Sequence, residues 1–249
     1  MTKQVVVALI VGLLAGAFVL GLVVVAGAVG FLVWNQEPAS TFVGDAAGEV
    51  QLRALDLNGD REAPIFVERL ARLGVAATVL EASREGATLS LSGARDVREA
   101  AAAVMAPMRL AIYATANPTQ EGGRTRLLTE CSTPPCTPVL VQLPSALGAR
   151  EIADAQVGGD EMGTTVINLA FTSDGALLLT ALTQREIGRA VVMTLDDVVY
   201  SQPIVQERIT GGRVQLTLGA SDEGARAQAE RISACIIGKP LTGRWEFAE

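Results

Sequence analysis

The pattern of apolar and polar positions divides the chain into a membrane-like start and a mixed body. An uncharged run of 29 residues extends from Val5 to Val33. As a helix it would be roughly 44 Å long, against about 30 Å of bilayer hydrocarbon. The pattern therefore predicts a transmembrane anchor over residues 1–36, followed by a polar linker over residues 37–47.

The charges beside the apolar run predict its orientation. Lys3 is the only charged side chain before Glu37, and positive charge next to a first membrane helix stays in the cytoplasm. We expect a single-pass protein of the inner (plasma) membrane with a cytoplasmic N-terminus and a periplasmic, extracytoplasmic body. A cleaved signal peptide ending at Ala17 or Ala28 is the alternative, but the length of the run favours an uncleaved anchor.

Small residues recur within this run. Gly12 and Gly16 form a small-xxx-small pair, a pattern that lets two membrane helices approach closely. Homodimerisation through this helix face is therefore a hypothesis. The alternative is that glycine is simply frequent in membrane helices.

The first half of the body predicts an α+β unit. Helical patterns occupy Pro64–Leu73 and Asp96–Ala106, and strand patterns occupy Gly48–Leu57, Ala76–Glu81, Thr88–Leu91 and Met108–Ala114. The order strand–helix–strand–strand–helix–strand is that of a ferredoxin-like unit. We therefore expect a ferredoxin-like base over residues 48–146, including a long loop over residues 115–138.

Two cysteines lie in that loop. Cys131 and Cys136 would form a small-loop disulfide in an exported body. Two exposed free thiols are the alternative, because spacing alone does not fix the geometry of a disulfide. Cys235, which lies among isoleucines, is interpreted as a buried apolar residue.

The second half predicts an α+β head subdomain with an antiparallel sheet over residues 147–240. Strand patterns occupy Ile152–Val157, Thr164–Thr172, Ala190–Leu195, Val198–Val205 and Arg213–Leu218, and helices are expected over 173–188 and 222–237. Ser173 and Ser221 are the expected helix caps. A last strand within residues 241–249 is expected to return to the base.

Composition narrows the chemistry. The chain has no histidine, which is the most frequent general base and metal ligand, so we expect a non-enzymatic protein without metal or cofactor. A net charge of −7 and 4% aromatic residues argue against a nucleic-acid partner. Asp56-x-Asn58-x-Asp60 resembles the start of a calcium loop, but Arg61 stands where that loop needs glycine, so a surface turn is preferred.

An ordered series of short motifs resembles the head of the large extracytoplasmic domain of the SecD protein-export family. Its members are Asp154, Ala155, Phe171, Gly175, Thr183, Gly188, Asp196, Pro203, Gly211 and Gly212. The residue types predict helix ends, strand ends and turns, so we expect structural rather than catalytic roles for them. The Asp196–Asp197 pair departs from the Asp-Gly of the family, and Asp197 is expected to fit a two-residue turn less comfortably.

The resemblance also implies a function. It implies a module that assists Sec-dependent translocation by contacting emerging polypeptide, with Sec translocon subunits and unfolded polypeptide as partners, in a cleft between base and head. In the SecD family, ionisable residues of further membrane helices couple export to the proton gradient, and no such residue is expected in this chain. A structural or adaptor protein of another envelope complex, built on the same fold, is the alternative.

Overall fold

The computed structural model describes residues 40–116, 124–130, 136–160, 163–217, 222–237 and 240–248. The predicted anchor, the Gly12–Gly16 pair and Cys131 lie outside these ranges. Among the described residues, no helix is both long and apolar enough to cross a bilayer. Ser40 to Glu249 form one compact unit of mixed α+β structure, whose strands all pair antiparallel.

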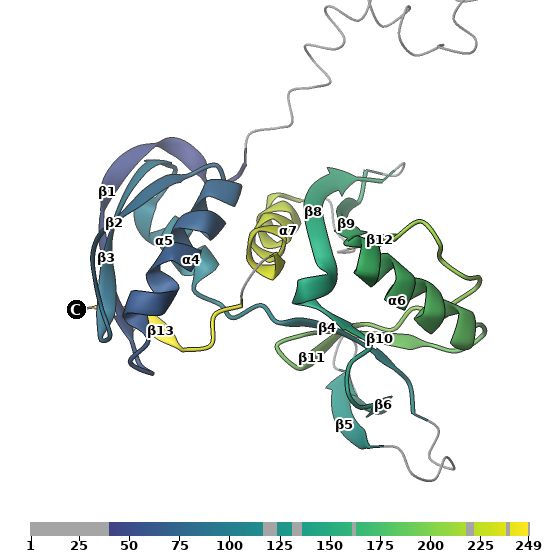
Figure 1. The fold of residues 1–249 in the computed structure, drawn as a ribbon. Helices are drawn as coiled ribbons and strands as arrows, with labels where there is room; N and C mark the ends of the chain where they lie inside the picture. Colours follow the sequence, from purple (N-terminus) through teal and green to yellow (C-terminus); the bar gives the residue numbers. More distant parts are fainter. Residues whose placement is uncertain are drawn as a thin grey trace, which may run out of the picture. The chain divides into compact units, whose positions relative to one another are not determined.

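The base is a four-stranded sheet covered on one face by two helices (Figure 1). Its strands are β1 (Val43–Ala54), β2 (Ala76–Ser83), β3 (Gly86–Ala94) and β13 (Trp245–Phe247), in the order β13-β1-β3-β2, and its helices are α4 (Gly59–Arg72) and α5 (Val97–Val104). Buried and exposed residues alternate along β1 from Val50 to Ala54 and along β3 from Ala87 to Leu91. This period of two places one apolar face against the helices.

The base takes its fourth strand from the C-terminal end of the described chain. Residues 108–114 are predicted as that strand, but β4 (Leu110–Ala114) instead pairs with β10 (Val191–Leu195) in the head. β13 occupies the free edge of β1, with Leu52 opposite Phe247. The predicted base over 48–146 therefore contains a strand that belongs to the sheet of the head.

The turn before β4 explains the difference. Met108 has a positive φ of 53°, which redirects the chain after α5. The carboxylate of Asp196 accepts hydrogen bonds from the backbone N–H of Met108 at 3.0 Å and of Arg109 at 2.9 Å. A long-range side-chain contact thus directs β4 into the head, and no local hydrophobic pattern reveals it.

The carboxylate of Glu62 in α4 holds the segment that leads into β13. It accepts hydrogen bonds from the backbone N–H of Thr242 at 2.7 Å and from the indole N–H of Trp245 at 2.8 Å. The ring of Trp245 also packs edge-to-face against Phe66, with the centroids 4.7 Å apart. Glu62 is buried, so the stability of the C-terminal strand depends on a desolvated carboxylate.

The head contains two antiparallel sheets, a separate hairpin and two long helices. One sheet has the order β12-β9-β8, with β8 (Ile152–Gly159), β9 (Thr165–Phe171) and β12 (Arg213–Thr217). The other has the order β11-β10-β4-β7, with β7 (Leu147–Gly148) and β11 (Val198–Ser201). The hairpin comprises β5 (Thr125–Glu130) and β6 (Thr137–Gln142). The long helices are α6 (Ser173–Arg185) and α7 (Glu223–Ile236), and the short helix η1 spans Ala149–Glu151.

The helix caps lie next to the predicted ones. Thr172 rather than Ser173 caps α6, because its hydroxyl accepts a hydrogen bond from the backbone N–H of Gly175 at 3.1 Å. Asp222 caps α7 through the N–H of Ala225 at 2.7 Å. A cap requires an extended residue one position before the first helical turn, and neighbouring Ser, Thr and Asp residues all suit that position.

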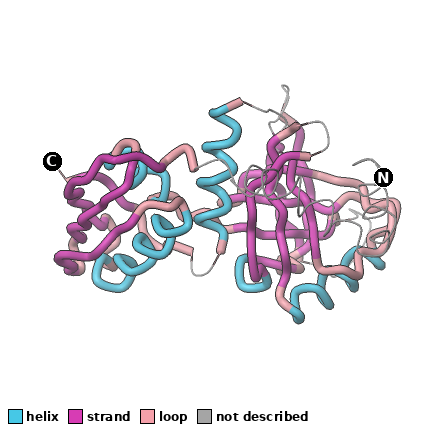
Figure 2. The backbone as a smooth tube through the Cα atoms, turned by 90° about the horizontal axis from the view of Figure 1, so that it is seen from above, coloured by secondary structure: helices cyan, strands magenta, loops and turns pink. Residues whose placement is uncertain are grey.

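Helix α7 contacts elements of both base and head, between whose strands it lies (Figure 2). The hydroxyl of Ser233 donates a 2.6 Å hydrogen bond to the carbonyl of Ala155 in β8. The carboxylate of Glu230 accepts hydrogen bonds from Ser40 and Thr41, where the described chain begins. One hydrophobic core includes residues of both halves, so base and head are packed as one body.

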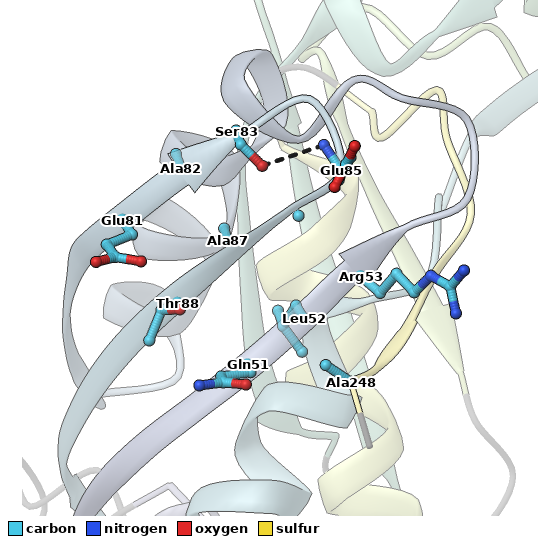
Figure 3. A pocket seen from close by; sticks show the side chains of 11 residues that line it. Gln51, Leu52, Arg53, Glu81, Ala82, Ser83, Glu85, Ala87, Thr88 and Ala248 are labelled. Atoms are coloured by element: carbon cyan, nitrogen blue, oxygen red, sulfur yellow. Dashed lines mark hydrogen bonds between the residues drawn. The ribbon is translucent and has the colours of Figure 1, made fainter.

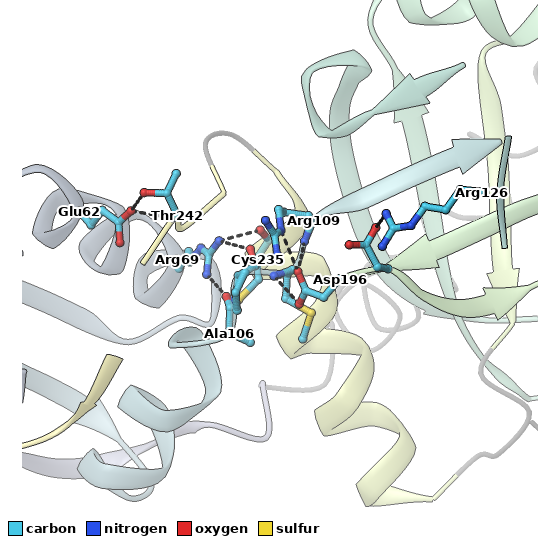
Figure 4. A network of polar contacts seen from close by, with 11 residues as sticks. Glu62, Arg69, Ala106, Arg109, Arg126, Asp196, Cys235 and Thr242 are labelled. Atoms are coloured by element: carbon cyan, nitrogen blue, oxygen red, sulfur yellow. Dashed lines mark hydrogen bonds and ion pairs between the residues drawn. The ribbon is translucent and has the colours of Figure 1, made fainter. Parts of the chain in front are cut away.

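The guanidinium of Arg69 lies at the centre of this packing (Figure 4). Its side chain is only 1% exposed. It donates hydrogen bonds to the carbonyl oxygens of Val104 at 2.9 Å, Pro107 at 3.0 Å and Cys235 at 3.2 Å, and also to that of Ala106. Burial lowers the pKa of Arg69, but an arginine remains charged at neutral pH.

Replacing Arg69 with Met should destabilise the whole body. The substitution leaves buried carbonyls at two helix ends without donors, so we expect a loss of about 3–5 kcal/mol in the free energy of unfolding. Urea denaturation measures it. The matched control is Arg72→Met on the same helix, whose ion pair with Glu68 is partly exposed and should contribute at most about 0.5 kcal/mol. Equal losses for the two variants would contradict this role of Arg69.

Glu62 should make stability depend on acid pH. Burial raises the pKa of Glu62, but hydrogen bonds from Thr242, Trp245 and Gly243 outweigh it and leave the pKa below its ordinary value. The stabilisation is therefore complete above the unfolded-state pKa of about 4.3 and is lost as the pH falls through the lower folded-state value.

We expect the unfolding free energy of the wild type to fall more steeply than that of Glu62→Gln between about pH 5 and pH 3. Chemical denaturation at a series of pH values measures this difference. Glu68→Gln changes an exposed glutamate of the same helix and should follow the wild type. Parallel curves for wild type and Glu62→Gln would show that the Glu62 carboxylate does not supply this stability.

Candidate functional site

Several of the motif residues fasten one loop to helix α6. The buried hydroxyl of Thr183 donates to the carbonyl of Leu179 at 2.8 Å and accepts from the N–H of Ile209 at 3.0 Å. The hydroxyl of Thr180 donates to the carbonyl of Ile209 at 2.8 Å. The two threonines thus hold both backbone polar groups of Ile209, which positions the segment between β11 and β12.

Glycines allow close approach at the start of α6. A Cβ at Gly175 would lie 2.5 Å from the carbonyl oxygen of Glu151 in η1, so a side chain cannot fit there. Gly212 has a φ of 59°, and its carbonyl accepts from the N–H of Phe171 at 2.9 Å. Both positions pack the loop ends against α6, whereas a Cβ at Gly211 would meet no atom within 4 Å.

The segment after β11 continues along β10. Gly188 follows α6 with a φ of 77° and donates its N–H to the carbonyl of Val205 at 2.8 Å. The carbonyl of Pro203 accepts from the N–H of Val191 at 3.0 Å. Residues 203–205 therefore pair with residues 188–191, which lead into β10.

Asp196 and Asp197 form the two-residue turn between β10 and β11. Both have positive φ, 50° and 68°, as a primed hairpin turn requires, although aspartate there costs more than glycine. The carboxylate of Asp197 pairs with Arg126 of β5 at 2.8 Å. Asp196 holds the start of β4, so the pair joins four strands, which is a structural role.

The remaining motif and cysteine residues lie elsewhere. The carboxylate of Asp154 accepts from the N–H of Ala155 at 2.9 Å, beside a register shift between β8 and β9. Cys136 is disulfide-bonded, but the pairing with Cys131 stays a prediction because Cys131 lies outside the described residues. Cys235 is a free, buried thiol. Burial raises its pKa and keeps the thiol protonated, although Arg69 acts in the opposite direction.

An apolar cavity of about 490 Å³ lies in the head beside α6. Leu179 and Leu182 of α6, Met193 of β10 and Ile112 of β4 contribute to its lining. Two backbone segments, residues 203–207 and 214–217, complete it. The side chain of Ile204 is 59% exposed, so the cavity reaches solvent at that point.

The charge of this cavity is low. Among the described residues that line it, Glu207 is the only ionisable one. The other polar members are hydroxyl and amide side chains, such as Ser201 and Gln215, and backbone groups. The cavity can therefore bury apolar side chains of a ligand and offer hydrogen bonds to it.

Two other hollows are more polar. One, of about 670 Å³, lies between α5, α7 and β11, where base and head meet, and Glu99, Asp196 and Arg231 bring charge to it. The other, of about 630 Å³, lies on the base sheet near the β2–β3 turn (Figure 3) and is lined by residues such as Gln51, Glu81 and Thr88. Of these three hollows, the one inside the head is the most apolar.

No metal chemistry is visible in the described part of the chain. Its residues contain no group of three or more Cys, Asp or Glu side chains placed to hold a metal ion. Asp56, from the calcium-loop resemblance, accepts instead from the backbone N–H of Arg244 at 2.8 Å. Asp56 thereby positions the segment before β13.

Comparison with protein families identifies the head. Residues 125–236 match the model of the SecDF P1 head subdomain, a range that contains every lining residue of the cavity except Ile112. The fold and this match define a P1-head type of α+β domain.

Individual relatives agree with this class. The chain is 32% identical over 105 residues to the protein translocase subunit SecD of Acidaminococcus fermentans, which covers 42% of this chain and 24% of that protein. It is 37% identical over 93 residues to SecD of Mycobacterium tuberculosis, covering 37% of this chain and 16% of that protein. With SecDF of Thermus thermophilus the identity is 34% over 98 residues, covering 39% and 13%. These relatives and the match over residues 125–236 support the SecD/SecDF family for this part of the chain.

Solved structures share the fold. A SecDF structure described as a membrane component that enhances protein export has a TM-score of 0.60 and 20% identity, over 81% of this chain and 98% of that one. SecDF in a super-membrane-facing form gives a TM-score of 0.61, also at 20% identity, over 100% of this chain and 35% of that one. The chain thus matches a quarter or less of the length of the curated relatives named above.

Thr183→Val should release the loop next to the cavity. Valine has nearly the same shape but leaves the part-buried N–H of Ile209 without this acceptor, at a cost of about 1 kcal/mol. We expect faster amide hydrogen exchange at Ile209 and a lower free energy of unfolding. Thr88→Val on the open face of the base sheet is the control and should leave Ile209 unchanged. Unaltered exchange in Thr183→Val would show that the hydroxyl does not position this loop.

Proposed function

We propose that the chain is a membrane-anchored, extracytoplasmic module that assists Sec-dependent protein translocation by binding unfolded polypeptide in the head cavity. The observation that carries the proposal is the apolar cavity beside α6, within the region that matches the SecDF head. Unfolded chains expose apolar side chains that folded proteins bury. Transferring such a side chain from water into the cavity is favourable by about 1.5–3 kcal/mol.

The lining suits a ligand of varied sequence. A single ionisable residue, Glu207, leaves the cavity without a strong charge preference. Hydrophobic contact is non-directional, so different apolar side chains can occupy the same space. Such binding is weak and reversible, which suits a chain in transit better than a tight complex.

A membrane anchor, which the apolar run at the start of the chain predicts, would assist this role by raising the local concentration of ligand. Tethering a binding domain beside the site where its ligand emerges raises the effective ligand concentration without any new contact. The apolar run Val5–Val33 has no ionisable side chain. The proposed role is therefore capture of polypeptide, and proton-driven movement would need charges outside this run.

Ile204→Glu should weaken polypeptide binding. The side chain lies on the lining of the cavity and is 59% exposed, so a charge there opposes apolar ligands with little cost to folding. We expect the dissociation constant for a reduced and alkylated, permanently unfolded protein to rise about 10-fold or more, which corresponds to about 1.4 kcal/mol. Fluorescence anisotropy with the full chain in detergent measures it, and the same protein in its native state should not bind.

Leu177→Glu is the matched control. Leu177 is also an exposed aliphatic residue of the head, at 71%, but does not line the cavity. It should bind as the wild type does. Equal affinity of wild type and Ile204→Glu would reject the cavity as the site. Co-purification from native membranes tests the wider role, since the absence of translocon subunits would favour an adaptor of another envelope complex.

A further inference from the structure

We infer that polypeptide enters the head cavity in extended form and adds as a β-strand to the free edge of β12. The inference deepens the proposed function and rests on it, because it specifies how the same cavity recognises its ligand. The ligand is a segment of unfolded polypeptide with apolar side chains and no acidic residue. The ligand is then recognised by hydrogen bonds to its main chain as well as by contacts with its side chains.

Strand β12 has an unpaired side. In the three-stranded sheet with the order β12-β9-β8, it pairs with β9 and with no further strand among the described residues. Gly212 lies opposite Phe171 and accepts its N–H bond. Hydrogen-bonded pairs alternate along an antiparallel ladder, so Val214 and Leu216 direct their N–H and C=O groups to β9. The corresponding groups of Gln215 point to the free edge.

The cavity lies against this free edge. Four consecutive residues of β12, Val214 to Thr217, line it. Successive side chains of a strand point to opposite faces of the sheet, so a hollow that touches four in a row must lie beside the backbone. A ligand there has access to the unpaired N–H and C=O groups of Gln215.

A second free backbone segment lines the same cavity. Five consecutive residues, 203–207, contribute to it. The backbone of Pro203 and Val205 is paired with Val191, Gly188 and Arg189 on one side. An inserted strand would therefore lie between two backbone segments, β12 and residues 203–207.

The side chains and charge of the cavity fit such a strand. Alternate side chains of the added strand would point into the apolar lining formed by residues such as Leu179 and Leu182, and the others would point away from it. The carboxylate of Glu207 repels acidic ligand residues and favours a basic flank. Main-chain hydrogen bonds are common to all sequences, which accounts for broad recognition of unfolded chains.

Backbone methylation of the ligand tests the inference without altering the protein. The probe is a fluorescent twelve-residue peptide of alternating leucine and serine between lysines. In an extended strand the N–H groups of all leucines point to one edge and those of all serines to the other. N-methylation of the leucines and of the serines, in two separate peptides, therefore removes donors from one edge at a time.

We expect at least one methylated peptide to bind the full chain about 10-fold more weakly than the parent, because it has lost the hydrogen bonds to β12. Binding of both methylated peptides within threefold of the parent would overturn strand addition. If the parent peptide and the unfolded protein both fail to bind, the proposed function itself fails. If the parent binds and Ile204→Glu weakens it while methylation has no effect, the cavity binds side chains alone.

Gln215→Pro tests the protein side of the same bond. Proline removes the N–H that points to the free edge, and proline is tolerated on edge strands where that N–H does not belong to the ladder. We expect about 10-fold weaker peptide binding for Gln215→Pro. The comparison variant Gln215→Ala also loses the side chain of this lining residue and its bond to Asn168 but keeps the N–H, so Gln215→Pro should bind the peptide more weakly than Gln215→Ala does. If Gln215→Pro lowers the melting temperature, the methylated peptides decide between strand addition and binding of side chains alone.

Discussion

The buried guanidinium of Arg69 is the contact on which the arrangement of base and head depends. Its charge is balanced by backbone carbonyls rather than by a contacting carboxylate: it bonds to the end of α5, to the connection that follows and to the end of α7. The C-terminal ends of helices carry partial negative charge, so two of them can stabilise one cation. Since α5 belongs to the base and α7 packs on the head strands, one side chain fixes both halves in a common core.

The pairing of the C-terminal strand β13 also constrains the order in which the chain can fold. β1 and β13 pair directly, yet the whole head lies between them in the sequence. The edge of the base sheet can therefore close only after the head has been made, and contacts of such long sequence separation are slow to form. Glu62 compensates by holding Thr242 and Trp245. Base and head are interleaved along the chain, although each has its own sheet.

Local patterns predicted most individual elements but not their long-range partners. The strands β1 and β3 and the caps of α6 and α7 lie close to their predicted positions, because they depend on neighbouring residues. The prediction assigned β4 to the wrong sheet. Its pairing depends on Asp196, which lies some eighty residues further along the chain. The roles of Arg69 and Ile204 were not predicted, because neither the burial of a charged side chain nor the lining of a cavity produces a periodic pattern in the sequence. The predicted membrane anchor lies outside the described residues and stays a prediction.

The cavity and the free edge of β12 are each unfavourable in an isolated protein. Space left beside apolar side chains sacrifices packing energy, and an unpaired strand edge invites association with other chains. Natural edge strands are blunted by proline, by charge or by a covering loop. β12 has no proline, its only charge is Arg213 at its first position, and its free side faces the cavity rather than a covering element. Both features become favourable if an extended, apolar chain occupies them in turn. Reversible binding of polypeptide that has not yet folded would then explain why the protein retains both the open cavity and the unpaired edge of β12.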